Sequence, residues 1–211
     1  VSEWNKFIRK NIIEGSDKAI LTRNDLVMSY NTFVDEFKDT IIVNSEDYII
    51  HDIKNFTNKD EIFGFNVTFI QVNGGNRTKP LFVVDHSNFN NVMLYYKLGE
   101  TYIQNAINAE KYNRSKRWKE YYEFRERNLL LANLLDRSTG KIKFSRDLDY
   151  GFALTSHKAQ GSTYADVYID VNDIVFDMRT GNPWGNIDET LRRLYTACSR
   201  CKNRLYLCYG K

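Results

Sequence analysis

The most constraining feature of the sequence is a polar loop between two strand-like runs. The loop holds residues 157–161 (HKAQG), and the short apolar runs on either side are 151–154 (GFAL) and 167–171 (VYIDV). Beyond them, apolar residues in 188–199 recur at the spacing of an amphipathic helix, and 204–209 (RLYLCY) has the composition of a strand. Strands that alternate with a helix predict an α/β sheet, in which ligands lie where strands end.

The N-terminal segment predicts the same fold class. Apolar residues at helical spacing indicate a helix from Trp4 to Ile12, which Gly15 would end. The run 18–22 (KAILT) has the character of a short strand, and 25–37 places apolar residues on one face of a second helix. A strand, a turn and a helix make one unit of an α/β sheet.

From Thr40 onward the composition becomes that of a β-rich region. The segments 41–53, 61–72 and 79–85 are rich in Ile, Val, Phe and Tyr, and apolar side chains alternate with polar ones within FNVTFIQV. The sequence VNGGN at 72–76 suits a hairpin turn, because Gly and Asn tolerate positive φ. We therefore expect a small β-barrel or curled sheet.

A highly charged helical block follows, at about 99–136. Basic residues interleave there with aromatic ones, an arrangement that can bind a nucleic-acid strand by charge and stacking. The alternative is a solvated helix face whose Trp118, Tyr122 and Leu129 turn inward. The sequence leaves both interpretations open.

Composition limits the classes of function. The 211 residues, 42% of them hydrophobic, suffice for one large domain or two small ones with cores of their own, and the net charge of +3 does not by itself mark a nucleic-acid binder. No apolar run approaches the roughly 18 residues of a membrane span, so no membrane partner is expected. The first residue is Val1, and we expect the chain to be part of a longer protein.

The three cysteines, Cys198, Cys201 and Cys208, lie close together near one end. An odd number in one cluster does not make a disulfide framework, which favours a reducing compartment. A structural zinc site needs four ligands, and no His has suitable spacing to this group. We predict no metal site.

The loop contains side chains of the kinds that bind phosphate. Thr155, His157, Ser162 and Thr163 can hydrogen-bond to phosphate oxygens, Lys158 adds positive charge, and Gly161 permits close approach of the backbone. A second candidate is Arg200, which follows the helix at 188–199 and precedes the last strand. A guanidinium held at such a junction can stabilise charge on a γ-phosphoryl group as an arginine finger.

Taken in order, these motifs resemble the C-terminal half of superfamily 1 DNA helicases, in the RecD/Dda-like branch. The family's motif V (T-x-H-K-[SA]-Q-G-x-[ST]) is matched by Thr155–Thr163, and its motif VI (L-Y-V-A-x-[ST]-R) by Leu194–Arg200. Motif IV, a strand-ending T-N with a later Asn, is partly matched by Asn24 and Asn31, with Arg23 in place of the usual Thr. The aromatic segment 118–124 is similar to a helix that this branch carries upstream of motif V.

The resemblance implies an α/β fold, in which a RecA-like second helicase domain at 1–44 and 147–211 is interrupted at 45–146 by an SH3-like β-rich and helical subdomain. It implies an ATP-dependent 5′-to-3′ DNA helicase that works on single-stranded DNA in the cytoplasm, in a bacterial nucleoid or a phage-infected cell. Its partners would be the N-terminal RecA-like domain of the same parent chain and replication or repair proteins. The residue roles that it implies are DNA contact for Thr155, His157, Lys158, Ser162, Thr163 and Asn24, nucleotide contact for Gln160, Gly161 and Arg200, and catalysis by Arg200.

The sequence contains no G-x-x-x-x-G-K-[ST] loop to cradle ATP. ATP and Mg²⁺ would therefore be held chiefly by the N-terminal domain, and this chain alone should hydrolyse little ATP and bind single strands weakly. Two alternatives stay open. One is a non-catalytic nucleic-acid-binding or protein-interaction module derived from a helicase, and the other is a self-contained hydrolase or metal enzyme that uses His157 and the cysteines.

Overall fold

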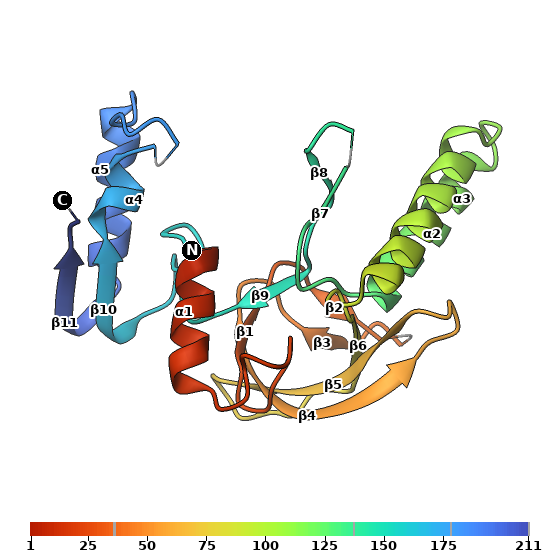
Figure 1. The fold of residues 1–211 in the computed structure, drawn as a ribbon, viewed down its shortest axis with the longest axis horizontal. Helices are drawn as coiled ribbons and strands as arrows, with labels where there is room; N and C mark the ends of the chain where they lie inside the picture. The colour runs from red at the N-terminus through yellow and green to blue at the C-terminus, as the bar shows by residue number, and fades with distance from the viewer. Residues whose placement is uncertain (36, 137, 178, 211) are drawn as a thin grey trace. The chain divides into compact units, whose positions relative to one another are not determined.

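A computed structural model describes residues 1–35, 37–136, 138–177 and 179–210. The chain forms two compact units, one of Ser2–Phe152 and one of Ala153–Lys211 together with Val1. Figure 1 follows the chain from its N-terminus to its C-terminus.

The larger unit begins with helix α1 (Ser2–Ile12), as the periodicity predicts. A buried ion pair fixes the helix to the segment that follows. Arg9 Nε and Nη2 each lie 2.7 Å from a carboxylate oxygen of Asp25, and Nη2 also donates to the carbonyl of Ala19 at 2.9 Å and to Thr22 Oγ1 at 3.0 Å. The guanidinium lies 4.6 Å from the ring centroid of Tyr150. These bonds hold residues 19–25 in an irregular, well-anchored loop.

A five-stranded antiparallel sheet with the order β6-β5-β4-β1-β9 forms the centre of this unit. Figure 1 shows that its long strands β4 and β5 are strongly curved. The strands are β1 (Leu26–Ser29), β4 (Asp47–Thr57), β5 (Phe63–Gln71), β6 (Leu81–Val84) and β9 (Leu148–Tyr150). Two small antiparallel hairpins accompany the sheet, β2 (Phe33–Val34) with β3 (Thr40–Ile42) and β7 (Leu134–Leu135) with β8 (Ile142–Phe144).

The inner face of the sheet carries the first apolar core. Ile50, Val67, Phe69 and Val83 are fully buried there, and Phe69 packs edge-on against Tyr48 with ring centroids 6.3 Å apart. The alternation of Val67 and Phe69 with polar neighbours is the pattern from which a half-buried strand is predicted. The turn that joins β5 to β6 has positive φ at Gly74 and Gly75, as the VNGGN sequence predicts.

Two antiparallel helices, α2 (Phe89–Ile107) and α3 (Arg114–Arg127), enclose a second core. The predicted helical block at about 99–136 is only partly helical, because α2 begins ten residues earlier and residues 134–135 form β7. Asn88 caps α2 by accepting from the backbone N–H groups of Asn90 and Asn91. Tyr95, Phe124 and Phe144 are fully buried in this core. Gly99 allows close packing, because a Cβ atom there would lie 2.7 Å from the Phe144 ring.

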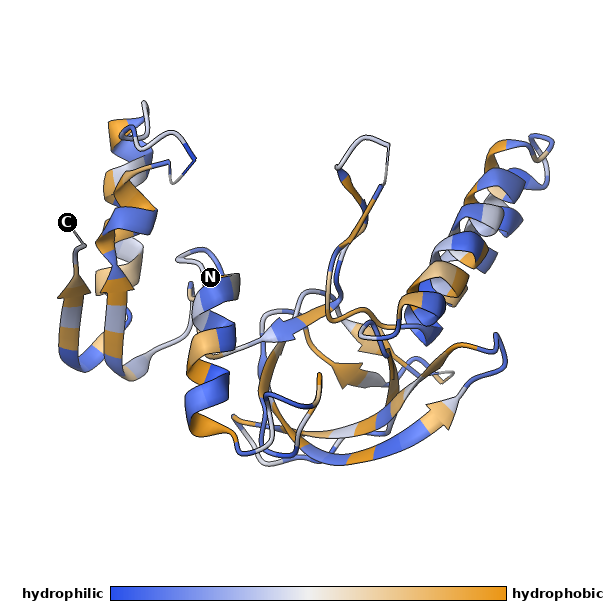
Figure 2. Cartoon of the chain, viewed as in Figure 1, coloured by the Kyte–Doolittle hydropathy of each residue, from blue (hydrophilic) through white to orange (hydrophobic). Residues whose placement is uncertain are grey.

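The smaller unit contains a parallel pair of strands joined through helices. Strands β10 (Tyr164–Asp170) and β11 (Cys201–Cys208) pair in parallel, and the chain between them forms α4 (Val171–Val175) and α5 (Ile187–Cys198). This is a βαβ connection, the unit expected of an α/β fold. Figure 2 shows hydrophobic and hydrophilic bands that alternate along both strands.

Three predicted elements are wrong. Residues 18–22 form turns and bends, although Leu21 is buried, and 151–154 form a bend after β9. The predicted helix at 25–37 is replaced by β1, a turn and β2, apart from Glu36, which lies outside the described residues. Val27, Met28 and Ser29 are all buried, so β1, which lies between β4 and β9, lacks the alternation that would distinguish a strand from a helix.

The predicted ranges 1–44 with 147–211 and 45–146 do not coincide with the two compact units. Strand β1 lies in the first of those ranges and β4 in the second, yet they pair in one sheet, with Val27 opposite Tyr48. The predicted ranges express a family resemblance, and as such they stay a prediction. Among the described residues, no helix has both the length and the apolar character needed to cross a bilayer.

Candidate functional site

The polar loop of the smaller unit is held in shape by its own backbone. The carbonyl of Thr155 accepts from Ala159 N at 3.0 Å, and its Oγ1 accepts from Lys158 N at 3.3 Å. Two further turns follow, from Gln160 N to His157 O at 3.3 Å and from Ser162 N to Ala159 O at 3.1 Å. Thr155 therefore caps a compact series of turns, so its hydroxyl has a structural role beside any contact with a ligand.

The side chains of the loop lie mostly at the surface. His157, Gln160 and Thr163 are exposed, whereas Lys158 and Ser162 are partly buried. Burial lowers the pKa of the Lys158 ammonium from its ordinary value. Gly161 has φ +91 with open space around it, so the backbone conformation, rather than crowding, favours glycine there.

The loop ends beside Arg200. Tyr164 N donates to the carbonyl of Arg200 at 2.8 Å, and Tyr164 is paired with Cys201 where β10 and β11 begin. The structure thus brings the predicted loop and the predicted arginine to the amino ends of two adjacent parallel strands. The expectation that the loop follows the end of a strand at 151–154 is wrong, because those residues form no strand.

The Arg200 guanidinium folds back onto the end of its own helix. Nε donates to the carbonyl of Thr196 at 3.1 Å, and Nη2 donates to Ser199 Oγ at 2.8 Å. A cation at this place is stabilised by the negative end of the helix dipole. Among the described residues Nη1 has no hydrogen-bond partner, so one edge of the planar group can still bind an anion.

The residues predicted from motif IV have other roles in the larger unit. Asn24 adopts a left-handed φ of 70° in the turn before β1, where its N–H donates to the carbonyl of Ile50 at 2.9 Å. It does not open a helix. Asn31 Nδ2 donates to Asp147 Oδ1 at 3.1 Å, and Arg125 Nη2 donates to the same oxygen at 3.0 Å. Asn31, itself exposed, is therefore part of a network around the buried Asp147 that joins the segment after β1 to α3 and to the residue before β9.

The aromatic segment of α3 is divided between core and surface. Trp118 contacts Tyr121 and Tyr122, with ring centroids 5.7 Å and 6.2 Å away. Of the residues that the solvated-helix alternative turns inward, Leu129 is fully buried but Tyr122 is 57% exposed, so that alternative is only partly met. The cluster presents an aromatic surface that a base could stack upon.

The cysteines are free thiols, with Cys198 and Cys201 partly buried and Cys208 exposed. Cys201 Sγ makes a weak hydrogen bond to the carbonyl of Ala165 at 3.8 Å. The part of the chain that the structure describes contains no group of three or more His, Cys, Asp or Glu side chains arranged to hold a metal ion.

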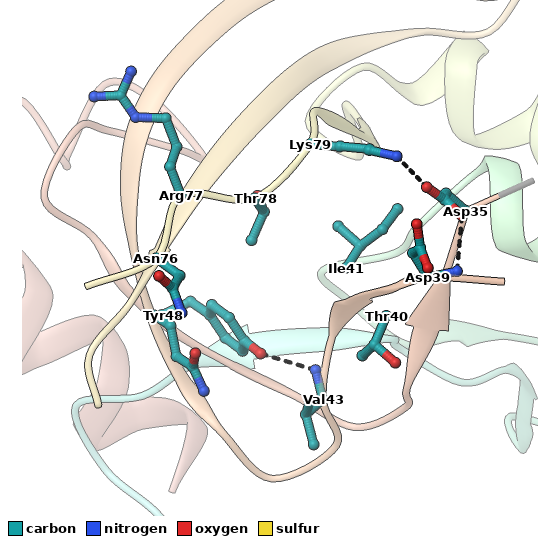
Figure 3. A pocket seen from close by; sticks show the side chains of 11 residues that line it. Asp35, Asp39, Thr40, Ile41, Val43, Tyr48, Asn76, Arg77, Thr78 and Lys79 are labelled. Atoms are coloured by element: carbon teal, nitrogen blue, oxygen red, sulfur yellow. Dashed lines mark hydrogen bonds and ion pairs between the residues drawn. The ribbon is translucent and has the colours of Figure 1, made fainter. Parts of the chain in front are cut away.

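Sequence patterns did not predict a hollow of about 380 Å³ beside the β2–β3 hairpin (Figure 3). Lys79 points to Asp35 and forms an ion pair with it, and Tyr48 Oη accepts from Val43 N at 2.8 Å. Arg77, on the opposite wall, points away from the Lys79–Asp35 pair. No local signal marks this hollow, since its lining comes from strands distant in sequence.

Sequence patterns also do not predict a stacked pair of tyrosines on the smaller unit. The rings of Tyr168 and Tyr206 lie 4.4 Å apart and almost parallel, and the neighbouring Arg204 forms an ion pair with Asp166. Their positions directly across the two strands explain the contact. The signal in the sequence is the alternation within DVYID and RLYLC, which becomes informative only when the register of the strands is known.

No protein-family model matches the chain. Among curated proteins it is similar to "Uncharacterized protein R530" of Acanthamoeba polyphaga mimivirus, with 41% identity over 59 residues. The match covers 28% of this chain and 10% of the mimivirus protein, so the chain spans about a tenth of the length of that relative. The name of that protein states no activity.

Proposed function

We propose that the chain is the C-terminal part of an ATP-dependent 5′-to-3′ DNA helicase, in which it couples ATP hydrolysis to movement along single-stranded DNA. The observation that carries the proposal is the hydrogen bond between Tyr164 N and the carbonyl of Arg200. It places the end of a loop rich in phosphate-binding side chains next to an arginine that has a free edge. A movement of either one is therefore transmitted directly to the other.

In this proposal the loop divides its contacts between two ligands. Thr155, His157 and Lys158 contact the DNA backbone, together with Ser162 and Thr163, while Gln160 and Gly161 face the nucleotide. His157 and Thr163 are exposed, as such contacts require. The lowered pKa of Lys158 reflects partial burial, and a phosphate nearby would favour its charged form. Asn24, in the other unit, makes a DNA contact of its own from an exposed turn.

Arg200 acts on the nucleotide. Its guanidinium leaves Thr196 and Ser199 to make a bidentate contact with the γ-phosphoryl group of ATP, where it stabilises the charge that develops during transfer to water. Of the hydrogen bonds that it gives up, the one to Ser199 is exposed and the one to Thr196 is partly buried, so water can replace at least the first. Mg²⁺ and the remaining phosphates are held by an N-terminal RecA-like domain, since the described residues contain no cluster suited to a metal.

The proposed setting follows from this activity. The partners are single-stranded DNA, the N-terminal domain of the parent chain and proteins of replication or repair, and the proposed location is the cytoplasm. A second candidate is a non-catalytic nucleic-acid-binding or protein-interaction module. The retracted Arg200 and the exposed Leu191 and Tyr195 on α5 favour it, because both suit docking more directly than chemistry.

The test is single-strand-stimulated ATP turnover by the full-length parent protein, with wild type compared with Arg200→Ala. Loss of an arginine finger should lower turnover by about a hundredfold or more while single-strand binding is retained. Arg192→Ala is the matched control, because Arg192 is an exposed arginine on α5, the helix that precedes Arg200, and its loss should leave turnover unchanged. Unchanged turnover in Arg200→Ala would remove Arg200 from the mechanism, and absence of turnover in the wild type would favour the binding module.

A further inference from the structure

A second hollow, of about 270 Å³, lies on the larger unit and is rich in cationic side chains. It is called the Arg77 groove here, and its lining residues are Arg23, His51, Asp52, Thr68 and Arg77. None of these residues belongs to the loop or to Arg200. The groove is therefore a separate candidate site.

A β-bulge brings two of these side chains into one hollow. The partners of Ile50 and Asp52 on β5 are the consecutive residues Phe69 and Thr68, so His51 is an extra residue in β4. Neighbours on a regular strand point to opposite faces, whereas a bulge turns an additional side chain toward one face. As a result both His51 and Asp52 line the groove. Thr68 reaches it because the adjacent Val67 and Phe69 are buried in the core.

The loop before β1 supplies Arg23. The left-handed turn at Asn24 and the bond from Asn24 N to Ile50 O hold this loop against β4 at the bulge. Arg23 Nη2 then lies 2.7 Å from Asp52 Oδ1. Arg23, which departs from the helicase pattern, thus has a defined place on the wall of the groove.

The groove carries more positive than negative charge. Asp52 is approached by Arg23 on one oxygen and by Lys54 on the other, at 3.8 Å, and the hydrogen bond from Arg23 holds its pKa below the ordinary value. Arg77 is exposed and forms no ion pair among the described residues. Arg23 and Arg77 in the lining, with Lys54 beside Asp52, outnumber the single carboxylate, which leaves an excess of positive charge. The imidazole of His51 and the hydroxyl of Thr68 add polar groups.

The polar surface continues beyond the groove. Arg77 also lines the hollow of Figure 3, where its neighbours Asn76 and Thr78 contribute an amide and a hydroxyl. The strand segment that carries Arg77 therefore separates two adjoining hollows. A single small anion would occupy one of them, whereas a polymer with regularly spaced phosphates can contact both.

We infer that the Arg77 groove binds the phosphodiester backbone of a nucleic-acid strand, with Arg77 and Arg23 as its phosphate ligands. The planar guanidinium groups match two phosphate oxygens at once, and His51 and Thr68 can hydrogen-bond to a third. The choice of a nucleic acid as the polymer rests on the proposed function. The site itself, on the sheet of the larger unit, does not depend on ATP or on Arg200.

The experiment measures binding of a fluorescent single-stranded oligodeoxynucleotide to the full chain by anisotropy, over a series of salt concentrations. Arg77→Gln should weaken binding by about three- to tenfold and lower the slope of log K against log salt by about 0.7, the value for one phosphate contact on a single strand. The double variant Arg23→Gln/Arg77→Gln should lower the slope by about twice as much. Lys97→Gln, at an exposed position on α2, removes one charge elsewhere and should change neither quantity.

Several outcomes would overturn the inference. They are absence of single-strand binding by the wild type, an unchanged slope in Arg77→Gln, or an equal loss in Lys97→Gln. Displacement of the oligonucleotide by inorganic phosphate at the same phosphate concentration would indicate a site for a free anion. If poly-glutamate bound as tightly as the oligonucleotide and lost affinity equally in Arg77→Gln, the partner would be an acidic peptide.

Failure of the groove and failure of the helicase proposal give different results. If Arg77→Gln binds the oligonucleotide as tightly as wild type but Arg200→Ala abolishes ATP turnover in the parent protein, the inferred role of the groove is wrong and the helicase proposal stands. If Arg77→Gln reduces the salt slope but the wild-type parent protein shows no turnover, the groove binds a nucleic-acid strand in a non-catalytic protein. Thermal unfolding of each variant should match wild type, because Arg23 and Arg77 are exposed.

Discussion

In the unit Ser2–Phe152 two clusters of apolar side chains are buried, whereas among the described residues of the unit Ala153–Lys211 the only buried apolar side chain is Ile169. The smaller unit leaves large apolar groups at its surface instead. Tyr168 is 69% exposed and Tyr195 is 75% exposed. The two units thus differ in what holds them together.

This difference indicates which unit is stabilised by a buried core of its own. Parallel strands normally lie in sheets that are covered on both faces, and a two-stranded sheet is marginal in water. The β10–β11 pair has neither a third strand nor much cover among the described residues. We therefore expect core substitutions in the larger unit to be costly, and comparable changes in the smaller unit to have little effect.

The largest effect should come from the buried ion pair of the larger unit. Arg9→Met leaves the Asp25 carboxylate buried without its partner, which should lower the free energy of unfolding by about 3–5 kcal/mol. The measurement is urea denaturation followed by circular dichroism. Lys10→Met is the matched control, because the neighbouring cation is exposed and should change stability by less than about 0.5 kcal/mol.

The double variant Arg9→Met/Asp25→Leu sharpens this prediction. It removes both charges, so the cost of burying an unpaired carboxylate disappears and much of the lost stability should return. If the double variant were as unstable as Arg9→Met, the loss would come from the bonds of Arg9 to Ala19 and Thr22 rather than from the charge on Asp25.

An effect of intermediate size should come from Asp47, the first residue of β4. Burial, and to a smaller extent Glu46, raises the pKa of Asp47 to about 6, and its Oδ1 is buried without a hydrogen-bond partner among the described residues. Because the folded chain binds this proton more tightly than the unfolded chain, the group stabilises the fold below its ordinary pKa, and that stability is lost as pH rises through about 6.

Asp47→Asn should therefore stabilise the chain at pH 7 by about 1–2 kcal/mol, a figure reduced for the partial exposure of the side chain. The advantage over wild type should shrink as pH falls to about 4, the ordinary range of a carboxyl group. Thermal unfolding of both chains at the two pH values gives the comparison. Asp17→Asn, at an exposed position, controls for the loss of one negative charge. If Asp47→Asn were more stable than wild type by the same amount at both pH values, the raised pKa of Asp47 would be contradicted.

The sequence predicts those parts of the larger unit whose periodicity is local. Helix α1, the alternating strand β5 and the turn with Gly74 and Gly75 lie close to where the pattern predicts them. Strand β1 could not be predicted in this way, because its partners Tyr48 and Tyr150 are remote in sequence and its own residues are buried on both faces. Pairing across such distances depends on the whole sheet and leaves no local pattern.

The candidate site likewise has a part that the sequence predicts and a part that it does not. The chemistry of their side chains predicts the loop at 155–163 and Arg200 as a candidate site, since several side chains suited to phosphate in one short segment are uncommon in a buried core. Their connection through Tyr164 could not be predicted, because it depends on the register of β10 against β11. The Arg77 groove was missed for a similar reason, as the bulge at His51 exists only in the paired strands. The chemistry of individual side chains can be predicted from the sequence, whereas the meeting of side chains from distant strands cannot.

The smallest effect should come from the smaller unit. Tyr206 is 37% exposed and stacks on Tyr168, a contact worth about 0.5–1.5 kcal/mol at most. Tyr206→Ala should therefore change the protection of β10 and β11 amides from hydrogen exchange only slightly, by less than about 1 kcal/mol. Phe69→Ala is the matched truncation in the larger unit, and its fully buried ring should cost about 3–5 kcal/mol. If both substitutions reduced protection equally, the smaller unit would have a core of its own, and the contrast between the two units would be lost.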